Sequence, residues 1–227
     1  SSIERSGAQG LLGEVDVKGI EALCEAAQIA KLKRLFYLSH LGADRASAFY
    51  LMKAKGIAET IIKNSGLSYT ILRSSMVYGE GDQFTLNLAS LLKISKGLVL
   101  VPGDGSVLLQ PLWVKDLATA LAWSIELPDT IDRVLEVGGP EHISFLDILK
   151  TISKTIKLKR FFVEIEPSRL GFLTQIIENM VKGFPTSSFW TDYLATDHIC
   201  ALDSMSRTFG INPARFHLQL DYLKPKK

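Results

Sequence analysis

The pattern of apolar and polar positions predicts a strand, a helix and a second strand in the first third of the chain. Residues 35–39 form a short apolar run that is typical of a buried strand. Residues 47–65 follow with helical periodicity, and Gly66 stands where a helix end favours a left-handed residue. Residues 69–72 are a second β-branched and aromatic run. Because the three segments span about 40 residues, we expect a βαβ unit with parallel strands.

The periodicity also predicts helices in the rest of the chain. We expect them over residues 15–30, 84–94, 114–125 and 145–156, with a short last helix that ends near Gly210. Ser144 and Asp203 are the expected N-caps of the last two. In the third helix, Ala118 and Ala122 are expected to face inward beside Leu117 and Leu121. Residues 168–181 have an amphipathic pattern, and residues 184–191 are expected to be irregular.

Further strands are predicted at residues 98–101, 107–109, 134–137 and 160–165. The sequence P-G-D-G separates the first two and is a strong turn signal, so we expect them to form a short hairpin. The last of the four alternates enough to be an edge strand.

Four motifs occur together in an order that is typical of one superfamily. They are L-S-H-L-G-A-D from Leu38, Y-T-I-L-R-S-S-M-V-Y-G from Tyr69, P-L-W-V-K-D-L-A from Pro111 and E-V-G-G-P-E-H-I-S from Glu136. With the lysine-bearing helix between the first two, the set resembles the atypical short-chain dehydrogenase/reductase (SDR) superfamily. The NmrA-like proteins and the dehydrogenase-like accessory subunit of respiratory complex I are the most similar branches. The resemblance covers residues 15–153. It implies an α/β fold with a Rossmann-like parallel sheet, and NAD or NADP as the cofactor.

A dinucleotide site also needs a glycine-rich turn after the first strand, where backbone N–H groups hold the pyrophosphate. No G-x-G-x-x-G follows a strand in this sequence. Gly7, Gly10 and Gly13 have a similar spacing, but no strand precedes them. Against the family pattern we therefore expect that roughly the first 70 to 80 residues of a full member are missing. We expect residues 1–137 to form a truncated Rossmann-like domain and residues 138–227 a smaller C-terminal subdomain.

Composition adds limits on the protein's surroundings. The chain has 227 residues, of which 47% are hydrophobic and 22% charged, and its net charge is +2, so a nucleic-acid partner is not expected. Cys24 and Cys200 lie in apolar helical contexts, which favours buried free thiols over a disulfide. No signal peptide and no membrane span is expected, because no run approaches about 20 apolar residues. We expect the protein in the cytoplasm or at the periphery of a membrane complex.

The family resemblance also implies a catalytic constellation. Active short-chain dehydrogenases place Y-x-x-x-K on a helix beside a serine at a strand end, and the lysine lowers the pKa of the tyrosine and holds the nicotinamide ribose. Ser39 matches the serine, and Lys53 or Lys55 matches the lysine. The tyrosine position is then Phe49 or Leu51, and neither can transfer a proton.

The resemblance implies that the cofactor site contains nine residues if both lysines are kept as candidates. They are Ser39, His40, Lys53, Lys55, Arg73, Ser74, Ser75, Met76 and Val77. A purely structural role also remains possible for several of these residues. The lysines are also compatible with a solvated helix face, and Arg73 with a buried cation paired to Asp82 or Asp116. The aromatic group of Phe189, Trp190 and Tyr193 fits either a substrate pocket or a subdomain core.

Three functions remain open at this point. The first is an NAD(P)-binding protein with weak or no dehydrogenase activity, acting as a sensor or as a scaffold in a larger assembly. The second is an active reductase or epimerase-type enzyme on an unknown small molecule, whose proton donor is His40, Tyr50 or water. The third is a structural protein that binds no cofactor.

Overall fold

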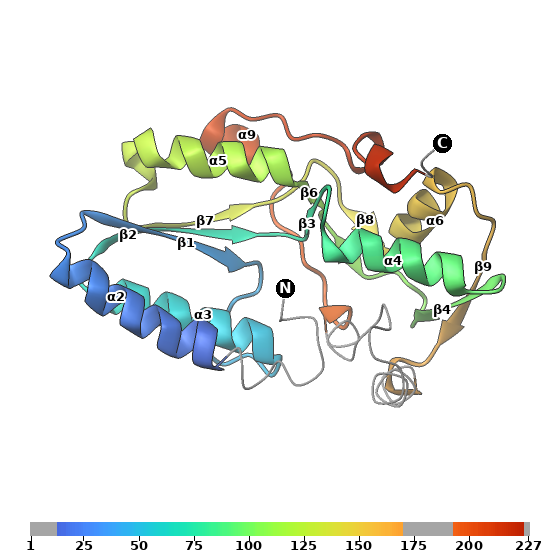
Figure 1. Cartoon of the computed structure of the whole chain (residues 1–227), viewed down its shortest axis with the longest axis horizontal. Helices are drawn as coiled ribbons and strands as arrows, with labels where there is room; N and C mark the ends of the chain where they lie inside the picture. Colours follow the sequence, from blue (N-terminus) through green and yellow to red (C-terminus); the bar gives the residue numbers. More distant parts are fainter. Residues whose placement is uncertain (1–12, 170–192, 225–227) are drawn as a thin grey trace.

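A three-stranded parallel sheet is the centre of the first layer of the protein. A computed structural model describes residues 13–169 and 193–224 (Figure 1). The sheet has the order β1 (Arg34–His40), β2 (Ser68–Ser74), β7 (Arg133–Val137). Leu35 pairs with Tyr69 and Ile71 with Val134, and all three strands run the same way. The prediction of neighbouring parallel strands is confirmed, and with it the α/β class.

Two helices cover one face of this sheet. A π-helical turn, η2 (Gly13–Lys18), leads into α2 (Gly19–Ile29), and α3 (Tyr50–Asn64) connects β1 to β2. Gly66 ends α3 with φ at 76°, as expected. Within α3, a Cβ at Gly56 would lie 2.3 Å from the backbone of Asp44 and Arg45. Glycine at this position therefore lets the loop after β1 pack directly on the helix.

The opposite face carries α5 (Val114–Glu126) and α9 (Ser204–Phe209) (Figure 1). The buried face of α5 consists of Leu117, Ala120 and Ser124, whereas Ala118 and Ala122 are exposed. The inward orientation predicted for those two alanines is wrong. Alanines contribute little apolar area, so they mark the buried side of a helix poorly, and one residue of error turns the face by about 100°.

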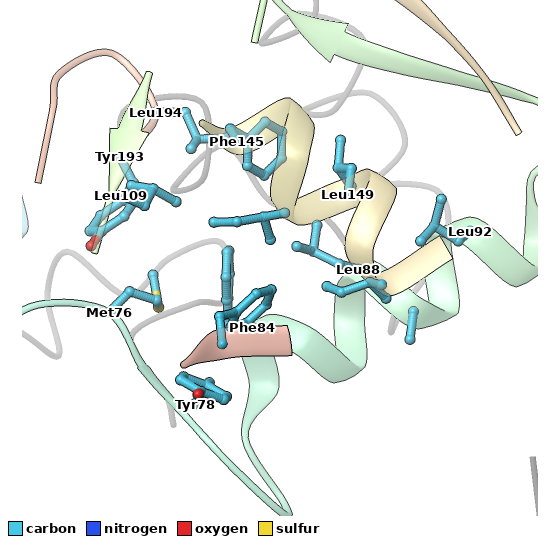
Figure 2. Packing of buried hydrophobic residues seen from close by; sticks show 14 of the residues in the cluster. Met76, Tyr78, Phe84, Leu88, Leu92, Leu109, Phe145, Leu149, Tyr193 and Leu194 are labelled. Atoms are coloured by element: carbon cyan, nitrogen blue, oxygen red, sulfur yellow. The ribbon is translucent and has the colours of Figure 1, made fainter. Parts of the chain in front are cut away.

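A second layer forms around α4 (Gln83–Ile94) and α6 (Phe145–Thr155). Figure 2 shows their side chains interdigitating, with Phe84 and Leu88 from α4 against Phe145 and Leu149 from α6. Ser144 caps α6 by accepting a hydrogen bond from the Asp147 N–H, as predicted. In the same core lie Met76, Tyr78, Leu109, Tyr193 and Leu194.

The predicted hairpin is wrong. β4 (Leu98–Pro102) pairs in parallel with β9 (Phe161–Ile165), and β5 (Leu108–Leu109) pairs antiparallel with β8 (Ile143–Ser144). The turn itself exists, since Gly103 and Gly105 both have positive φ. After this turn the chain continues into β5 and does not pair back onto β4. The partner of β4 is β9, which follows α6 in the sequence, and a local sequence pattern cannot predict such a long-range pairing.

Short elements complete the fold. Strands β3 (Val77–Tyr78) and β6 (Leu112–Trp113) pair in parallel, and single 3₁₀ turns are η3 (Pro128–Thr130), η4 (Phe216–Leu218) and η5 (Asp221–Leu223). Asp203 occupies the N-cap of α9 but its carboxylate pairs with Arg207 and gives no capping bond; Gly210 ends the helix at φ 67°. Residues 170–181 and 184–191, expected to be amphipathic and irregular, lie outside the described residues.

Candidate functional site

The ends of β1 and β2 bring several predicted site residues together. The strand register pairs Ser39 with Arg73 and His40 with Ser74. The Ser74 hydroxyl donates to the backbone carbonyl of Ser39 at 3.4 Å, and both serines are buried. Because parallel strands end on one edge of a sheet, these four residues lie at the edge where open α/β sheets bind ligands.

Ser39 is held by a carboxylate from α3. Its hydroxyl donates to Glu59 Oε1 at 2.7 Å, and Glu59 is only 1% exposed. The guanidinium of Arg73 binds the same carboxylate through two nitrogens, at 2.8 and 2.7 Å, and the bond to Glu59 raises the pKa of Arg73. A charge this deeply buried is stable only when it is paired and hydrogen-bonded, and Glu59 is both.

The partner of Arg73 corrects the earlier expectation, which was Asp82 or Asp116. Asp82 instead caps α4, where it accepts from the Thr85 N–H at 2.6 Å. Asp116 accepts from the Ala214 N–H at 2.8 Å. The sequence pattern did not identify Glu59 as a site residue. It lies on the buried side of α3, and a charge on a buried helix face signals a partner of opposite sign.

The two candidate lysines occupy different environments. Lys53 is exposed on the outer side of α3. Lys55 faces the sheet, where its Nζ lies 2.6 Å from Asp16 Oδ1 and 5.1 Å from the centre of the Tyr37 ring. Burial and the nearby carboxylates of Asp16 and Glu59 raise the pKa of Tyr37 well above its ordinary value. Asp16 is a further residue that the sequence did not single out.

The tyrosine positions of the family hold no proton donor. Leu51, four residues before Lys55, is buried in the second-layer core. Phe49, four residues before Lys53, is the N-cap residue of α3 and packs against the same core. Tyr50 lies between them and is 38% exposed. A hydroxyl is therefore missing from both registers of the Y-x-x-x-K pattern.

His40 is partly buried and belongs to a group of aromatic rings with buried Tyr193 and His198. Its Nε2 lies 3.0 Å from the Tyr193 hydroxyl and its Nδ1 2.8 Å from the Leu41 carbonyl. The ring of His198 stacks on Tyr193 at 4.0 Å and meets His40 edge-on at 5.6 Å. Burial lowers the pKa of His40 to about 4, so the ring is neutral at neutral pH. The Leu41 carbonyl then fixes the proton on Nδ1.

The segment after β2 is tied to neighbouring strands. The Ser75 N–H donates to the Val137 carbonyl at 2.9 Å, and the Met76 carbonyl accepts from Leu112 at 2.8 Å. Val77 begins β3. Buried Gln110 links three segments here. Its side-chain amide donates to the Gly139 carbonyl and accepts from the Cys200 N–H, both at 2.7 Å. Its backbone carbonyl accepts from the Ser75 hydroxyl. The sequence did not identify Gln110.

The two cysteines are not part of this site. Cys24 and Cys200 are free and buried, as predicted, and burial raises the pKa of both thiols. Tyr193 is buried in the second-layer core, whereas Phe189 and Trp190 lie outside the described residues. Among residues 13–169 and 193–224, no three His, Cys, Asp or Glu side chains come close enough to hold a metal ion, and no helix has the length and apolar character to cross a bilayer.

Comparisons with known proteins agree with this geometry. A family model described as NAD(P)H-binding matches residues 4–90, and one described as NAD dependent epimerase/dehydratase matches residues 51–138. The photosystem II assembly factor Ycf39 of Cyanophora paradoxa is 38% identical over 60% of this chain and 41% of its own length. Subunit 9 of the NADH dehydrogenase [ubiquinone] 1 alpha subcomplex of Rattus norvegicus is 25% identical over 58% of this chain and 34% of its own.

Solved structures show the same fold. The NADPH complex of the quinone oxidoreductase QOR2 from Escherichia coli superposes with a TM-score of 0.69 at 17% identity, over 90% of this chain and 70% of that one. The chain spans between about a quarter and a half of the length of the curated relatives it matches. The two family models and these relatives confirm the resemblance to Rossmann-type NAD(P)-binding domains of the atypical SDR superfamily, which the motifs predicted.

Proposed function

We propose that the protein is an NAD(P)-binding atypical SDR-like protein with weak or no dehydrogenase activity, acting as a sensor or as a scaffold in a larger assembly. One observation carries the proposal: at the family's tyrosine position, four residues before Lys55, stands buried Leu51. General acids contribute about 10² to 10⁴ in rate, and a leucine supplies none of this. Ser39 supports the same conclusion, because its hydroxyl proton already goes to Glu59.

The residues present are suited to the ribose side of a dinucleotide. Lys55 offers an ammonium group on the sheet side of α3. When bound, the cofactor would supply a nicotinamide capable of hydride transfer; this chain would bind it through Lys55, Ser74 and the backbone up to Val77. His40 is a poor replacement acid, since its Nε2 has no proton to give in the neutral form fixed by Leu41.

The names of the relatives support the scaffold part of the proposal. One is an assembly factor of photosystem II and another a subunit of NADH dehydrogenase. Both names connect the relative with a larger protein assembly. We extend the same role to this chain, with residues 1–137 as the dinucleotide-binding part and residues 138–227 as the smaller subdomain.

Two measurements on the full chain test the proposal. The first is a titration with NADH and NADPH, followed by nucleotide fluorescence, for the wild type, Lys55→Met and the matched control Lys53→Met. We expect saturable binding that Lys55→Met weakens about tenfold, the effect of one lost charge-assisted bond, while Lys53→Met stays within about twofold. A thermal melt of each variant separates lost binding from lost folding, because Asp16 loses its partner in Lys55→Met.

The second measurement is turnover of both nucleotides across a panel of aldehydes, ketones and quinones. Binding without turnover supports the proposal. Turnover well above background would favour the reductase reading, with Tyr50 or water as the donor. Absence of binding in a folded chain would favour a structural protein.

A further inference from the structure

We propose that the outer face of the β4/β9 sheet docks the protein onto a membrane surface with anionic headgroups. This face lies far from the ends of β1 and β2 (Figure 1). The register pairs Leu98 with Phe161 and Leu100 with Val163, so the four side chains stand on one side of the two strands. They are 55%, 79%, 38% and 41% exposed.

The inner side of the same strands behaves as a normal core. Val99 and Val101 are 2% and 1% exposed and pack on the second-layer core with Phe162. Both sides of β4 are therefore apolar, although strict alternation would place polar residues outside. Large apolar side chains gathered on an exposed face mark an interaction surface, whereas scattered ones are ordinary.

Charge is one-sided where β4 and β9 begin, whereas Glu164 and Glu166 lie toward the other end of the sheet. Residues 84–103 and 148–163 contain no Asp or Glu, yet carry seven of the chain's 26 basic residues. These are Lys93, Lys96, Lys150, Lys154, Lys157, Lys159 and Arg160. In the described parts of the chain, five of these lysines have no ion pair; only Lys150 pairs, with Asp147. Since the whole chain has a net charge of only +2, these two segments are unusually basic.

The fold brings two of these lysines, Lys96 and Lys159, to the most apolar end of the face. Because β4 and β9 are parallel and Leu98 pairs with Phe161, Lys96 and Lys159 lie beside each other, two residues before this pair. The Phe161 N–H donates to the Gly97 carbonyl at 2.8 Å, and Arg160 Nε donates to the Leu92 carbonyl at 2.7 Å. These bonds hold the two basic segments together at one end of the sheet.

A lipid surface fits this arrangement better than a protein partner does. Lysine is depleted from the centres of protein interfaces, where arginine and tyrosine are enriched. At a membrane, lysine stems follow apolar surface while their ammonium groups reach the headgroups, and an aromatic ring enters the interface. Each lysine near an anionic surface contributes about 1 kcal/mol, which is roughly a fivefold change in partitioning.

Co-sedimentation of the full chain with vesicles tests the proposal. The vesicles contain phosphatidylcholine alone or with about 30% phosphatidylserine, at low and at high salt. We expect partitioning into the anionic vesicles at least about tenfold above the neutral ones, and largely lost at high salt. The double variant Lys96→Glu/Lys159→Glu should lower it by at least about tenfold, and Phe161→Ser by about fivefold or more.

Matched controls separate the face from bulk charge and general apolarity. Lys31→Glu/Lys33→Glu makes the same charge change near the end of α2, and Ile125→Ser removes a side chain that is 63% exposed on α5. Both should stay within about twofold of the wild type. Equal losses in the controls, or no preference for anionic vesicles, would overturn the proposal. So would self-association that Phe161→Ser abolishes without any vesicle binding, because the face would then belong to a second copy.

Discussion

The hydroxyl of Ser39 donates a 2.7 Å hydrogen bond to the carboxylate of Glu59, which is almost completely buried. The serine position of the family is thereby engaged in supporting α3 against the sheet. The same carboxylate holds the guanidinium of Arg73 through two bonds, so one buried charge organises the ends of β1 and β2.

We predict that Glu59→Gln strongly destabilises the fold. The substitution keeps the shape of the side chain but leaves Arg73 without its counter-charge. Removing one partner of a buried pair typically costs about 3 to 5 kcal/mol, and we expect the lower end because Arg73 keeps some access to water. The free energy of unfolding from urea titration measures the loss. Lys150→Gln breaks the exposed pair with Asp147 and should change it by less than about 1 kcal/mol. Similar values for both variants would contradict the assignment.

A second prediction concerns the missing proton donor. Leu51→Tyr places a phenol four residues before Lys55, on the same side of α3. If the full chain has residual hydride transfer in the carbonyl panel, we expect this variant to raise it by about 10². Phe49→Tyr is the control in the other register, where the lysine is exposed, and its rate should equal that of the wild type. Equal background rates in all three proteins would argue that the site at the ends of β1 and β2 serves binding alone.

The sequence alone could predict the elements that local periodicity controls. Strands β1 and β2 and the glycine that ends α3 appear where the pattern placed them, and the motif set identified the superfamily. Long-range pairing could not be predicted in the same way. β4 pairs with β9 more than 60 residues later, because α6 returns the chain to the same side of the second layer. No sequence signal near β4 indicates this pairing, whereas the P-G-D-G turn beside it suggests a hairpin. The predicted hairpin was wrong for this reason.

The site was predictable only as far as the motifs extended. They placed Ser39 and Arg73 at neighbouring strand ends, and the register agrees. They gave neither Glu59 as the shared partner nor Asp16 as the partner of Lys55, since both pairs join separate elements. The choice between Lys53 and Lys55 also depended on which side of α3 faces the sheet. The sequence could not decide this, because α3 has apolar residues on several sides and an error of one residue turns the helix face by about 100°.

A third prediction concerns the attachment of the C-terminal segment. Asp82 accepts from the Thr85 N–H at the start of α4 and from the Tyr222 hydroxyl at 2.9 Å. We expect Asp82→Ala to cost about 2 kcal/mol or more, because it removes a cap and a long-range bond together. Ser144→Ala removes the cap of α6 alone and should cost about 1 kcal/mol. Tyr222→Phe isolates the long-range bond, at about 1 kcal/mol. Unfolding in urea compares them, and equal losses for Asp82→Ala and Ser144→Ala would contradict the link.

The last prediction follows from the burial of His40 between Leu41, Tyr193 and His198. Burial is the main cause that lowers its pKa to about 4, from an ordinary value of 6.5; nearby His198 and Lys55 act in the same direction. As the pH falls below 6.5, His40 becomes protonated in the unfolded chain but stays neutral in the folded chain. The contribution of His40 to the free energy of unfolding is therefore fully present above about pH 6.5. It is lost progressively down to about pH 4, below which His40 is protonated in both states.

Between about pH 7.5 and pH 5 this single group should cost the wild type about 2 kcal/mol of unfolding free energy. His198, whose pKa burial also lowers, adds in the same direction. Urea titrations at the two pH values measure the difference. In His40→Gln, which keeps a polar side chain but cannot titrate, we expect the pH-dependent loss to shrink by about 2 kcal/mol, whereas His217→Gln, at an exposed histidine, should keep the wild-type loss. An unchanged loss in His40→Gln would mean that the His40 ring takes up its proton while the chain stays folded.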